Sequence, residues 1–142
     1  MRDLLPLGKE VLASQPFSVL LGAEIVDFSE GRAELRIPIT DQLRQQHGFA
    51  HGGVISYAAD NALAFAGASV LGTAVVTSEF KINYLRPATG DLLIARATVI
   101  HCGKSQAVCR CDVFVSAEQG ERLSATSQGT IARLGQSSDV KV

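Results

Sequence analysis

The feature that most constrains the fold of this chain is a run of apolar and small residues from Val54 to Leu71. The run is long enough to raise the question of a membrane span, but it carries Asp60 and Asn61 in its middle, and Ala and Gly dilute its hydrophobicity. Because it is apolar or small nearly all the way round, we predict a helix surrounded by protein and opened by Gly52-Gly53.

The sequence on both sides of this run has the two-residue period of strands. Residues 32–39 alternate charged and apolar side chains, and the turn Ser29-Glu30-Gly31 pairs them with a strand at 23–28. After residue 72 the pattern predicts four more strands, at 76–84, 92–100, 106–115 and 123–133. Within the first of these, the even-numbered residues, such as Phe80 and Ile82, alternate with the odd-numbered ones, such as Thr77.

One long buried helix and about six strands joined mainly by hairpins predict an α+β fold, with an antiparallel sheet wrapped on the helix. A doubly wound fold would need helices between the strands, and the sequence shows no helical pattern after residue 72. The 142 residues fit a single domain, 1–142. Residues 3–14 predict a short helix with Asp3 as a candidate cap, ended by Gln15-Pro16, and the polar tail 135–142 is expected to fray.

Composition excludes several classes of protein. Hydrophobic residues make up 46% of the chain, which excludes intrinsic disorder. Thirteen Lys and Arg against fourteen Asp and Glu leave no basic excess for a nucleic-acid partner. The three cysteines form no disulfide framework, and no apolar leader follows Met1, so we expect a cytoplasmic protein without a membrane partner. The low charge content indicates that apolar surface is covered by self-association.

Two features of the apolar run carry candidate chemistry. Asp60 is a carboxylate midway along an apolar helix, so it is either a structural group bound to a loop backbone or a general base or nucleophile. His51-Gly52-Gly53 begins the same helix, where free N–H groups at the positive end of the dipole could hold an oxyanion. Glycine there lets a carbonyl approach the backbone closely, although Gly pairs at helix starts also serve simple turns.

Other polar residues point less clearly to a function. Gln45-Gln46-His47 lies in a polar loop, where the amides could hold a carbonyl or a water, while His47 and His101 are expected at the surface. Cys109 and Cys111 are two apart on one strand face and are interpreted as small core residues. No phosphate-binding loop motif occurs, and the separated histidines and Cys109-x-Cys111 do not match zinc spacing, so we expect no metal.

These residues together resemble a known family. Gln45-x5-His51-Gly52-Gly53-x6-Asp60, followed by Phe80-Lys81-Ile82-Asn83-Tyr84-Leu85-Arg86-Pro87-Ala88 and Gly90-Asp91, is similar to the PaaI-like branch of the hotdog-fold acyl-CoA thioesterases. The segment Pro16-Phe17…Leu21-Gly22…Glu30-Gly31-Arg32-Ala33 resembles that family as well. The resemblance spans about residues 16–133 and implies a curved antiparallel sheet around a long central helix, with paired subunits.

The resemblance also implies roles for individual residues. Asp60 takes the position of the carboxylate that attacks the thioester or activates water, one methylene shorter than the Glu of another branch. The backbone N–H of Gly52 would polarise the thioester carbonyl, with His51 beside it and Gln45 at the family's Asn or Gln position. Thr77 falls at the place of a strand Ser or Thr that supports the carboxylate. Candidate contacts to coenzyme A are Arg86, Lys104 and Ser105, although the Gly103-Lys104-Ser105 turn is first of all a hairpin.

The expected function is hydrolysis of an acyl- or aroyl-CoA to the free acid and coenzyme A, with no cofactor because coenzyme A is part of the substrate. The expected assembly is a homodimer or a dimer of dimers. Because Gly52 and Asp60 lie eight residues apart on one helix, the site is expected to combine two chains. The alternatives are a non-catalytic acyl-CoA binding or regulatory protein on the same fold, and a hotdog hydratase, for which we find no matching His and acid pair. Asp60 favours the thioesterase, because a pure binder has no need of a costly carboxylate.

Overall fold

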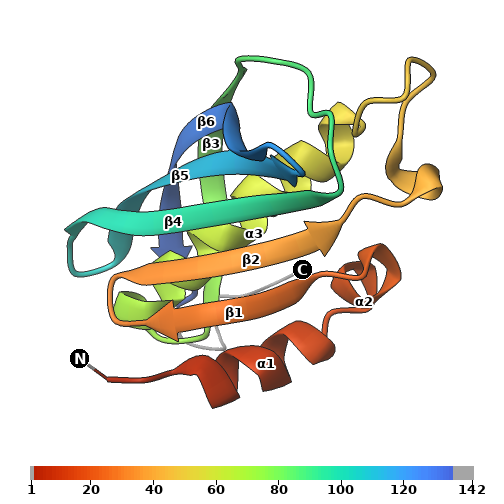
Figure 1. Cartoon of the computed structure of the whole chain (residues 1–142). Helices are drawn as coiled ribbons and strands as arrows, with labels where there is room; N and C mark the ends of the chain where they lie inside the picture. The colour runs from red at the N-terminus through yellow and green to blue at the C-terminus, as the bar shows by residue number, and fades with distance from the viewer. Residues whose placement is uncertain (1, 136–142) are drawn as a thin grey trace.

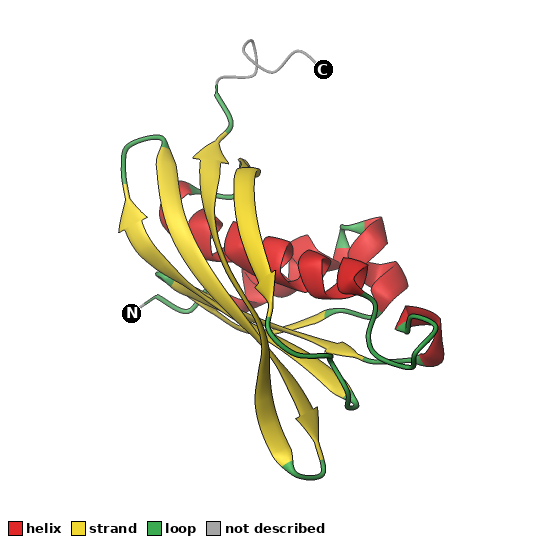
Figure 2. Cartoon of the chain, turned by 90° about the horizontal axis from the view of Figure 1, so that it is seen from above, coloured by secondary structure: helices red, strands yellow, loops and turns green. Residues whose placement is uncertain are grey.

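A single six-stranded antiparallel sheet curls around a long helix, and this arrangement confirms the predicted α+β architecture (Figures 1 and 2). The computed structural model describes residues 2–135, so the predicted frayed tail lies outside the described residues except for Gly135. The central helix is α3 (Gly52–Leu71). The strands lie in the order β1-β2-β4-β5-β6-β3. Their bounds are β1 Glu24–Ser29, β2 Arg32–Pro38, β3 Val75–Tyr84, β4 Leu92–Cys102, β5 Gln106–Ala117 and β6 Gly120–Arg133.

Small side chains let α3 lie close to the concave face of the sheet. Ala59, Ala62 and Ala66 are fully buried against the strands. At Gly67 an added Cβ would lie 2.6 Å from the side chain of Ile131 on β6, so only glycine allows this approach. Within the part of the chain that the structure describes, α3 is the one helix long and apolar enough to cross a membrane, and 56% of its apolar window is buried inside the protein. Its apolar residues therefore form the protein core, as predicted.

The N-terminal region contains two helices where the sequence predicted one. α1 (Leu5–Ala13) agrees with the predicted helix, and the Asp3 carboxylate accepts a hydrogen bond from the Leu5 N–H (3.0 Å). Gln15-Pro16 does end α1, but Pro16 then opens a second helix, α2 (Pro16–Leu21). The prediction missed α2 because proline was read only as a stop, whereas its fixed φ also suits the first position of a helix.

A β-bulge in β3 departs from the strict alternation that the sequence suggested. The pairing of β3 with β6 shifts between Thr77 and Glu79. A regular strand would place Thr77 with Glu79 on the outer face, but the bulge lets Thr77 face α3 while Val76 is 47% exposed. A single extra residue thus brings a hydroxyl from the edge strand to the central helix.

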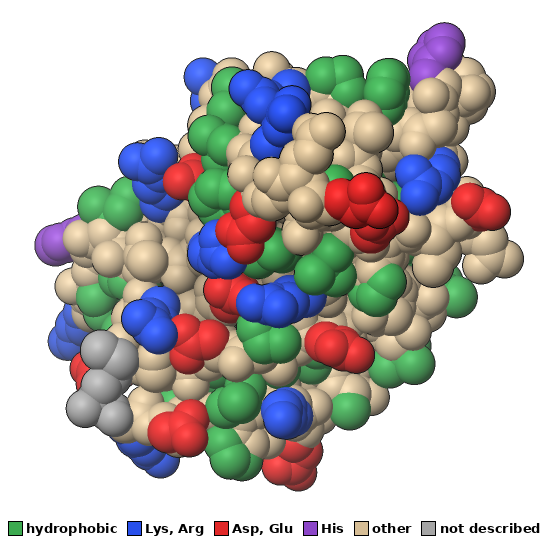
Figure 3. Space-filling view, viewed as in Figure 1, with side chains coloured by type: hydrophobic (Ala, Val, Ile, Leu, Met, Phe, Trp, Pro, Cys, Tyr) green, Lys and Arg blue, Asp and Glu red, His purple; other side chains and the backbone are tan. Residues whose placement is uncertain are grey.

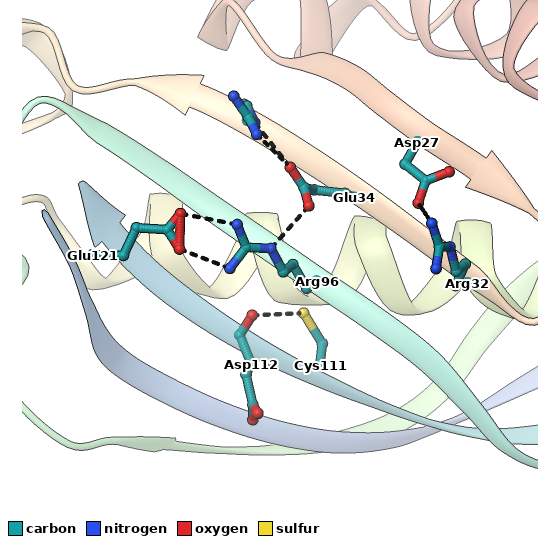
Figure 4. Close-up of polar contacts among 8 residues, drawn as sticks. Asp27, Arg32, Glu34, Arg96, Cys111, Asp112 and Glu121 are labelled. Atoms are coloured by element: carbon teal, nitrogen blue, oxygen red, sulfur yellow. Dashed lines mark hydrogen bonds and ion pairs between the residues drawn. The ribbon is translucent and has the colours of Figure 1, made fainter.

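The outer face of the sheet is covered by paired charges. The Arg96 guanidinium donates two hydrogen bonds to Glu121 (2.8 and 2.9 Å) and one to Glu34 (2.8 Å) (Figure 4). It also lies 5.0 Å from the ring centre of Phe114. The hydrogen bonds from Arg96 lower the pKa of Glu121. Positive and negative side chains are interspersed over this face rather than gathered by sign (Figure 3). The polar outer face therefore resembles an ordinary solvated surface.

Candidate active site

The first candidate group is the N-terminal turn of α3. His51 is the N-cap residue, and its Nδ1 accepts a hydrogen bond from the Gly53 N–H (2.8 Å). Because Nδ1 is the acceptor, the neutral ring carries its proton on Nε2, which leaves an N–H donor on the exposed side of the imidazole. Gly52 occupies the first helical position, where the backbone N–H has no acceptor within its own helix. The turn thus presents N–H donors at the positive end of the helix dipole.

Tyr84 holds this turn against the sheet. Its hydroxyl donates to the Gly52 carbonyl oxygen (3.1 Å), although the residue lies on β3, 32 positions along the chain. A Cβ added at Gly52 would lie 3.5 Å from the Tyr84 hydroxyl, which is ordinary van der Waals contact. The predicted site did not include Tyr84. The sequence feature that pointed to this residue is its place in the family-like stretch Tyr84-Leu85-Arg86-Pro87.

The second candidate group is the Asp60 carboxylate. Asp60 is half-buried on α3, and its Oδ1 accepts a hydrogen bond from the Thr77 hydroxyl (2.7 Å). The structure therefore brings together these two residues of the predicted site. Among the described residues, Asp60 forms no ion pair with Lys, Arg or His. A carboxylate held by one neutral donor and left without a cation keeps lone pairs available for chemistry.

Asp60 and Gly52 are not brought together within one chain. Eight residues of α3 separate them, which corresponds to about 12 Å along the axis at 1.5 Å per residue. A single carbonyl group cannot contact both, because attack and oxyanion stabilisation each require approach to about 3 Å. The predicted site is therefore incomplete in one copy of the chain.

Gln45 lies in the loop before α3, and its side chain stabilises that loop. Its Oε1 accepts hydrogen bonds from the backbone N–H of His47 (2.5 Å) and Phe49 (3.4 Å). The amide oxygen is thus occupied, and the amide NH2 is the part of this half-buried side chain that could donate to a ligand. His47 and His101 are exposed, as predicted.

Two concavities lie near these groups. The first, which we call the Arg86 hollow, has a volume of about 590 Å³ and is lined by residues that include Phe49, Arg86, Thr89 and Arg122. It adjoins the start of α3, because the Ala50 N–H donates to the Ala88 carbonyl (3.0 Å). Two guanidinium groups in one hollow suit an anionic ligand.

The second concavity, the Ala64 cavity, has a volume of about 100 Å³. It lies between α1, α3 and the start of β3, and Asn61, Ala64, Ala68 and Val75 are among its lining residues. Ala64 is one helical turn after Asp60, and Val75 is two residues before Thr77. The cavity is thus lined by residues of the same two elements, α3 and β3, that carry the Asp60–Thr77 pair.

Lys104 and Ser105 do not join Arg86 in one chain. They lie in the hairpin between β4 and β5, at the opposite end of β4 from the Arg86 loop (Figure 1). The 11 residues of β4 correspond to roughly 35 Å at 3.3 Å per residue. These three candidate contacts to coenzyme A thus form no common site in a single copy.

The cysteines offer no nucleophile near Asp60 or Gly52. Cys109 and Cys111 are fully buried, as predicted, and burial raises the pKa of Cys109 to about 11, so its thiol stays protonated at neutral pH. Across residues 2–135, no three His, Cys, Asp or Glu side chains gather in a group that could hold a metal ion. The acid–base group beside the Thr77 hydroxyl is the Asp60 carboxylate.

Comparison with known proteins identifies the family. A sequence profile of the thioesterase superfamily matches residues 47–122. The acyl-coenzyme A thioesterase PaaI of Escherichia coli is 35% identical over 116 residues, which cover 81% of this chain and 80% of that protein. The 1,4-dihydroxy-2-naphthoyl-CoA hydrolase of Listeria monocytogenes is 31% identical over 114 residues, which cover 79% of this chain and 90% of that protein.

A solved structure agrees with these sequence matches. A thioesterase family protein from Silicibacter pomeroyi superposes with a TM-score of 0.84 at 36% sequence identity, covering 89% of this chain and 95% of that chain. This likeness confirms the predicted hotdog fold, in which the sheet wraps around α3. Fold, profile and relatives agree, and the chain belongs to the thioesterase superfamily.

Proposed function

We propose that this protein hydrolyses an acyl- or aroyl-CoA thioester to the free acid and coenzyme A. The observation that carries the proposal is the Asp60 carboxylate, which accepts a hydrogen bond from the Thr77 hydroxyl and has no cation paired with it among the described residues. The helix that carries it also lines a cavity. A relative that acts on acyl-coenzyme A and another that acts on an aromatic CoA thioester support this substrate class.

Two chemical routes are open to Asp60. As a general base it takes a proton from water, the water oxygen attacks the carbonyl carbon, and the C–S bond breaks as the thiolate leaves and is protonated. As a nucleophile it forms a mixed anhydride with release of the thiolate, and water then hydrolyses the anhydride. In both routes the developing oxyanion lies against the Gly52 N–H, with His51 and Gln45 as further donors.

The site combines two chains in this proposal. A two-fold pairing with antiparallel α3 helices sets Gly52 of one subunit opposite Asp60 of the other and produces two equivalent sites. The free edge of β3 supports such a pairing, because it is ten residues long and carries the exposed side chains of Val76 and Tyr84.

The substrate then extends in two directions from the shared carbonyl. The phosphates of coenzyme A bind at Arg86 in the Arg86 hollow, on the subunit that supplies Gly52. The acyl group enters the Ala64 cavity on the subunit that supplies Asp60. An apolar cavity of roughly 150 Å³ accepts a benzene ring, so about 100 Å³ suits a compact acyl group. Lys104 and Ser105 could reach the same coenzyme A only from another copy of the chain, in the dimer or in a dimer of dimers.

The cytoplasm is the proposed location, because cysteines 102, 109 and 111 are all free. The alternative function, a non-catalytic acyl-CoA binding or regulatory protein, uses the same hollow and cavity but has no use for the unneutralised Asp60 carboxylate.

The test is release of coenzyme A from a panel of acetyl-, hexanoyl-, palmitoyl-, benzoyl- and phenylacetyl-CoA, followed by chromatography. Chromatography is preferred to a thiol reagent because the exposed Cys102 would react with the reagent. Turnover of the compact thioesters supports the proposal. Binding of these thioesters without any release of coenzyme A would establish the binding protein instead.

A further inference from the structure

Tyr84 contacts Gly52, the residue that carries the proposed oxyanion donor, although it is not among the predicted site residues. Its hydroxyl donates to the Gly52 carbonyl, and its ring lies beside the Gly52 Cα. The same Gly52–Gly53 peptide donates its N–H to His51 Nδ1. This peptide directly follows the Gly52 N–H in the chain, and it is held at both polar atoms, by Tyr84 on the oxygen and by His51 on the N–H.

The position of Tyr84 is itself fixed by the sheet. The N–H of Leu85, the next residue, donates to the Ser124 carbonyl on β6 (2.8 Å). The Ser124 side chain, only 1% exposed, donates to the Arg86 carbonyl (2.9 Å). These bonds hold the chain just beyond Tyr84 against β6. The hydrogen bond from Tyr84 to Gly52 therefore fixes the first turn of α3 relative to the sheet.

We propose that Tyr84 is a positioning residue for the Gly52 N–H, and that it acts on the site whose Asp60 belongs to the partner subunit. The inference rests on the proposed thioesterase function and its shared site. One strand then serves both sites of the dimer, because β3 supports Asp60 through Thr77 in one site and Gly52 through Tyr84 in the other.

The first test is the variant Tyr84→Phe, which keeps the ring and deletes the hydrogen bond. We expect kcat to fall about three- to tenfold, the range that loss of one neutral hydrogen bond gives, while KM changes by less than about twofold. The circular dichroism spectrum and the oligomeric state should match wild type. An unchanged kcat, or a loss confined to KM, overturns the positioning role.

The second test asks which Asp60 depends on Tyr84. Mixed dimers that pair an Asp60→Asn chain with a chain carrying intact Asp60 are isolated through a different affinity tag on each chain. The one catalytically active site of such a dimer combines the intact Asp60 with the Gly52 of the Asp60→Asn chain. Tyr84→Phe should therefore lower activity when it is placed in the Asp60→Asn chain, and should leave activity unchanged when it is placed in the other chain.

The matched control is built into this design, because both mixed dimers contain the same substitutions and differ only in their placement. Equal losses in the two dimers, or loss only when Tyr84→Phe shares a chain with the intact Asp60, overturn the proposal. Failure of the proposed function has a different signature: wild-type protein would release no coenzyme A, or Asp60→Asn homodimers would be fully active, and the Tyr84 proposal would fall with it.

Discussion

The protein contains two aspartate–threonine pairs of nearly equal geometry in different surroundings. Thr77 donates to Asp60 (2.7 Å) between β3 and α3, and Thr126 donates to Asp112 (2.6 Å) on the outer face of the sheet. Asp112 is also within 3.4 Å of the Arg110 guanidinium, whereas no cation pairs with Asp60 among the described residues. Both carboxylates are half-buried.

The difference between these pairs indicates which carboxylate is available for chemistry. Asp112 belongs to a surface where charges are paired, and the Arg110 guanidinium lies against the same carboxylate that accepts the Thr126 hydrogen bond. Asp60 lies on the helix that lines the Ala64 cavity, and among the described residues it is supported only by the Thr77 hydroxyl. The pair on the outer face therefore serves as an internal control for the pair at the site.

The largest expected effect comes from removing the charge of each aspartate in turn. Asp60→Asn is nearly isosteric, should keep the fold, and should lower kcat about 10²- to 10⁴-fold, because an amide is neither a base nor a nucleophile. Asp112→Asn should keep the wild-type rate. Steady-state release of coenzyme A measures both variants, and equal activity of Asp60→Asn and Asp112→Asn would remove the catalytic assignment.

The next largest effect is expected from removing the backbone N–H of Gly52, the proposed oxyanion donor opposite Asp60. Gly52→Pro deletes the N–H and should lower kcat about 10²- to 10³-fold. The backbone tolerates proline here, because Gly52 is the first helical position and His51 already has ψ 140°. Gly52→Ala keeps the N–H and adds a methyl group in ordinary contact with Tyr84, so its rate should stay within a few-fold of wild type. A folded, fully active Gly52→Pro enzyme is incompatible with the oxyanion role.

A smaller effect is expected from the threonines. Thr77→Val removes the hydrogen bond that orients Asp60 and should lower kcat about tenfold, while Thr77→Ser should retain most of the rate. Thr126→Val deletes the matching bond on the outer face and should change thermal stability only. If the two valine variants have the same kcat, the Thr77 hydroxyl does not orient the reacting carboxylate.

The smallest expected effect comes from a substitution that tests whether the acyl group binds in the Ala64 cavity. Ala64→Leu adds three carbon atoms to the wall of the Ala64 cavity and should raise KM several-fold for hexanoyl-CoA, with little change for acetyl-CoA. Leucine favours helices, so α3 should persist. A rise in KM that is equal for both thioesters would place the acyl group elsewhere.

The parts of this account that the sequence predicted are those with a local signal. The apolar run predicted α3 as the core helix. The short motif from Gln45 to Asp60 contained both the candidate oxyanion donor, Gly52, and the candidate catalytic carboxylate. The missed features depend on contacts between distant residues. The hydrogen bond of Tyr84 to Gly52 joins positions 32 apart, and the bulge that turns Thr77 inward is invisible to a period-two pattern.

The candidate contacts to coenzyme A were predicted to act together, but they lie far apart in the fold. Arg86 and Lys104 are only 18 residues apart in the sequence, but β4 carries them to opposite ends of the sheet. The extended strand between them separates the two residues in space, although they are close in the sequence.

The most direct test of the central claim, a site shared by two chains, is complementation between two inactive variants. Asp60→Asn and Gly52→Pro chains are mixed, unfolded and refolded together, and mixed dimers are verified by mass spectrometry. Each mixed dimer then has one site with both lesions and one site with neither. Activity should return towards about a quarter of wild type if pairing is random and the sites act independently. Verified mixed dimers with no recovered activity would contradict the shared site.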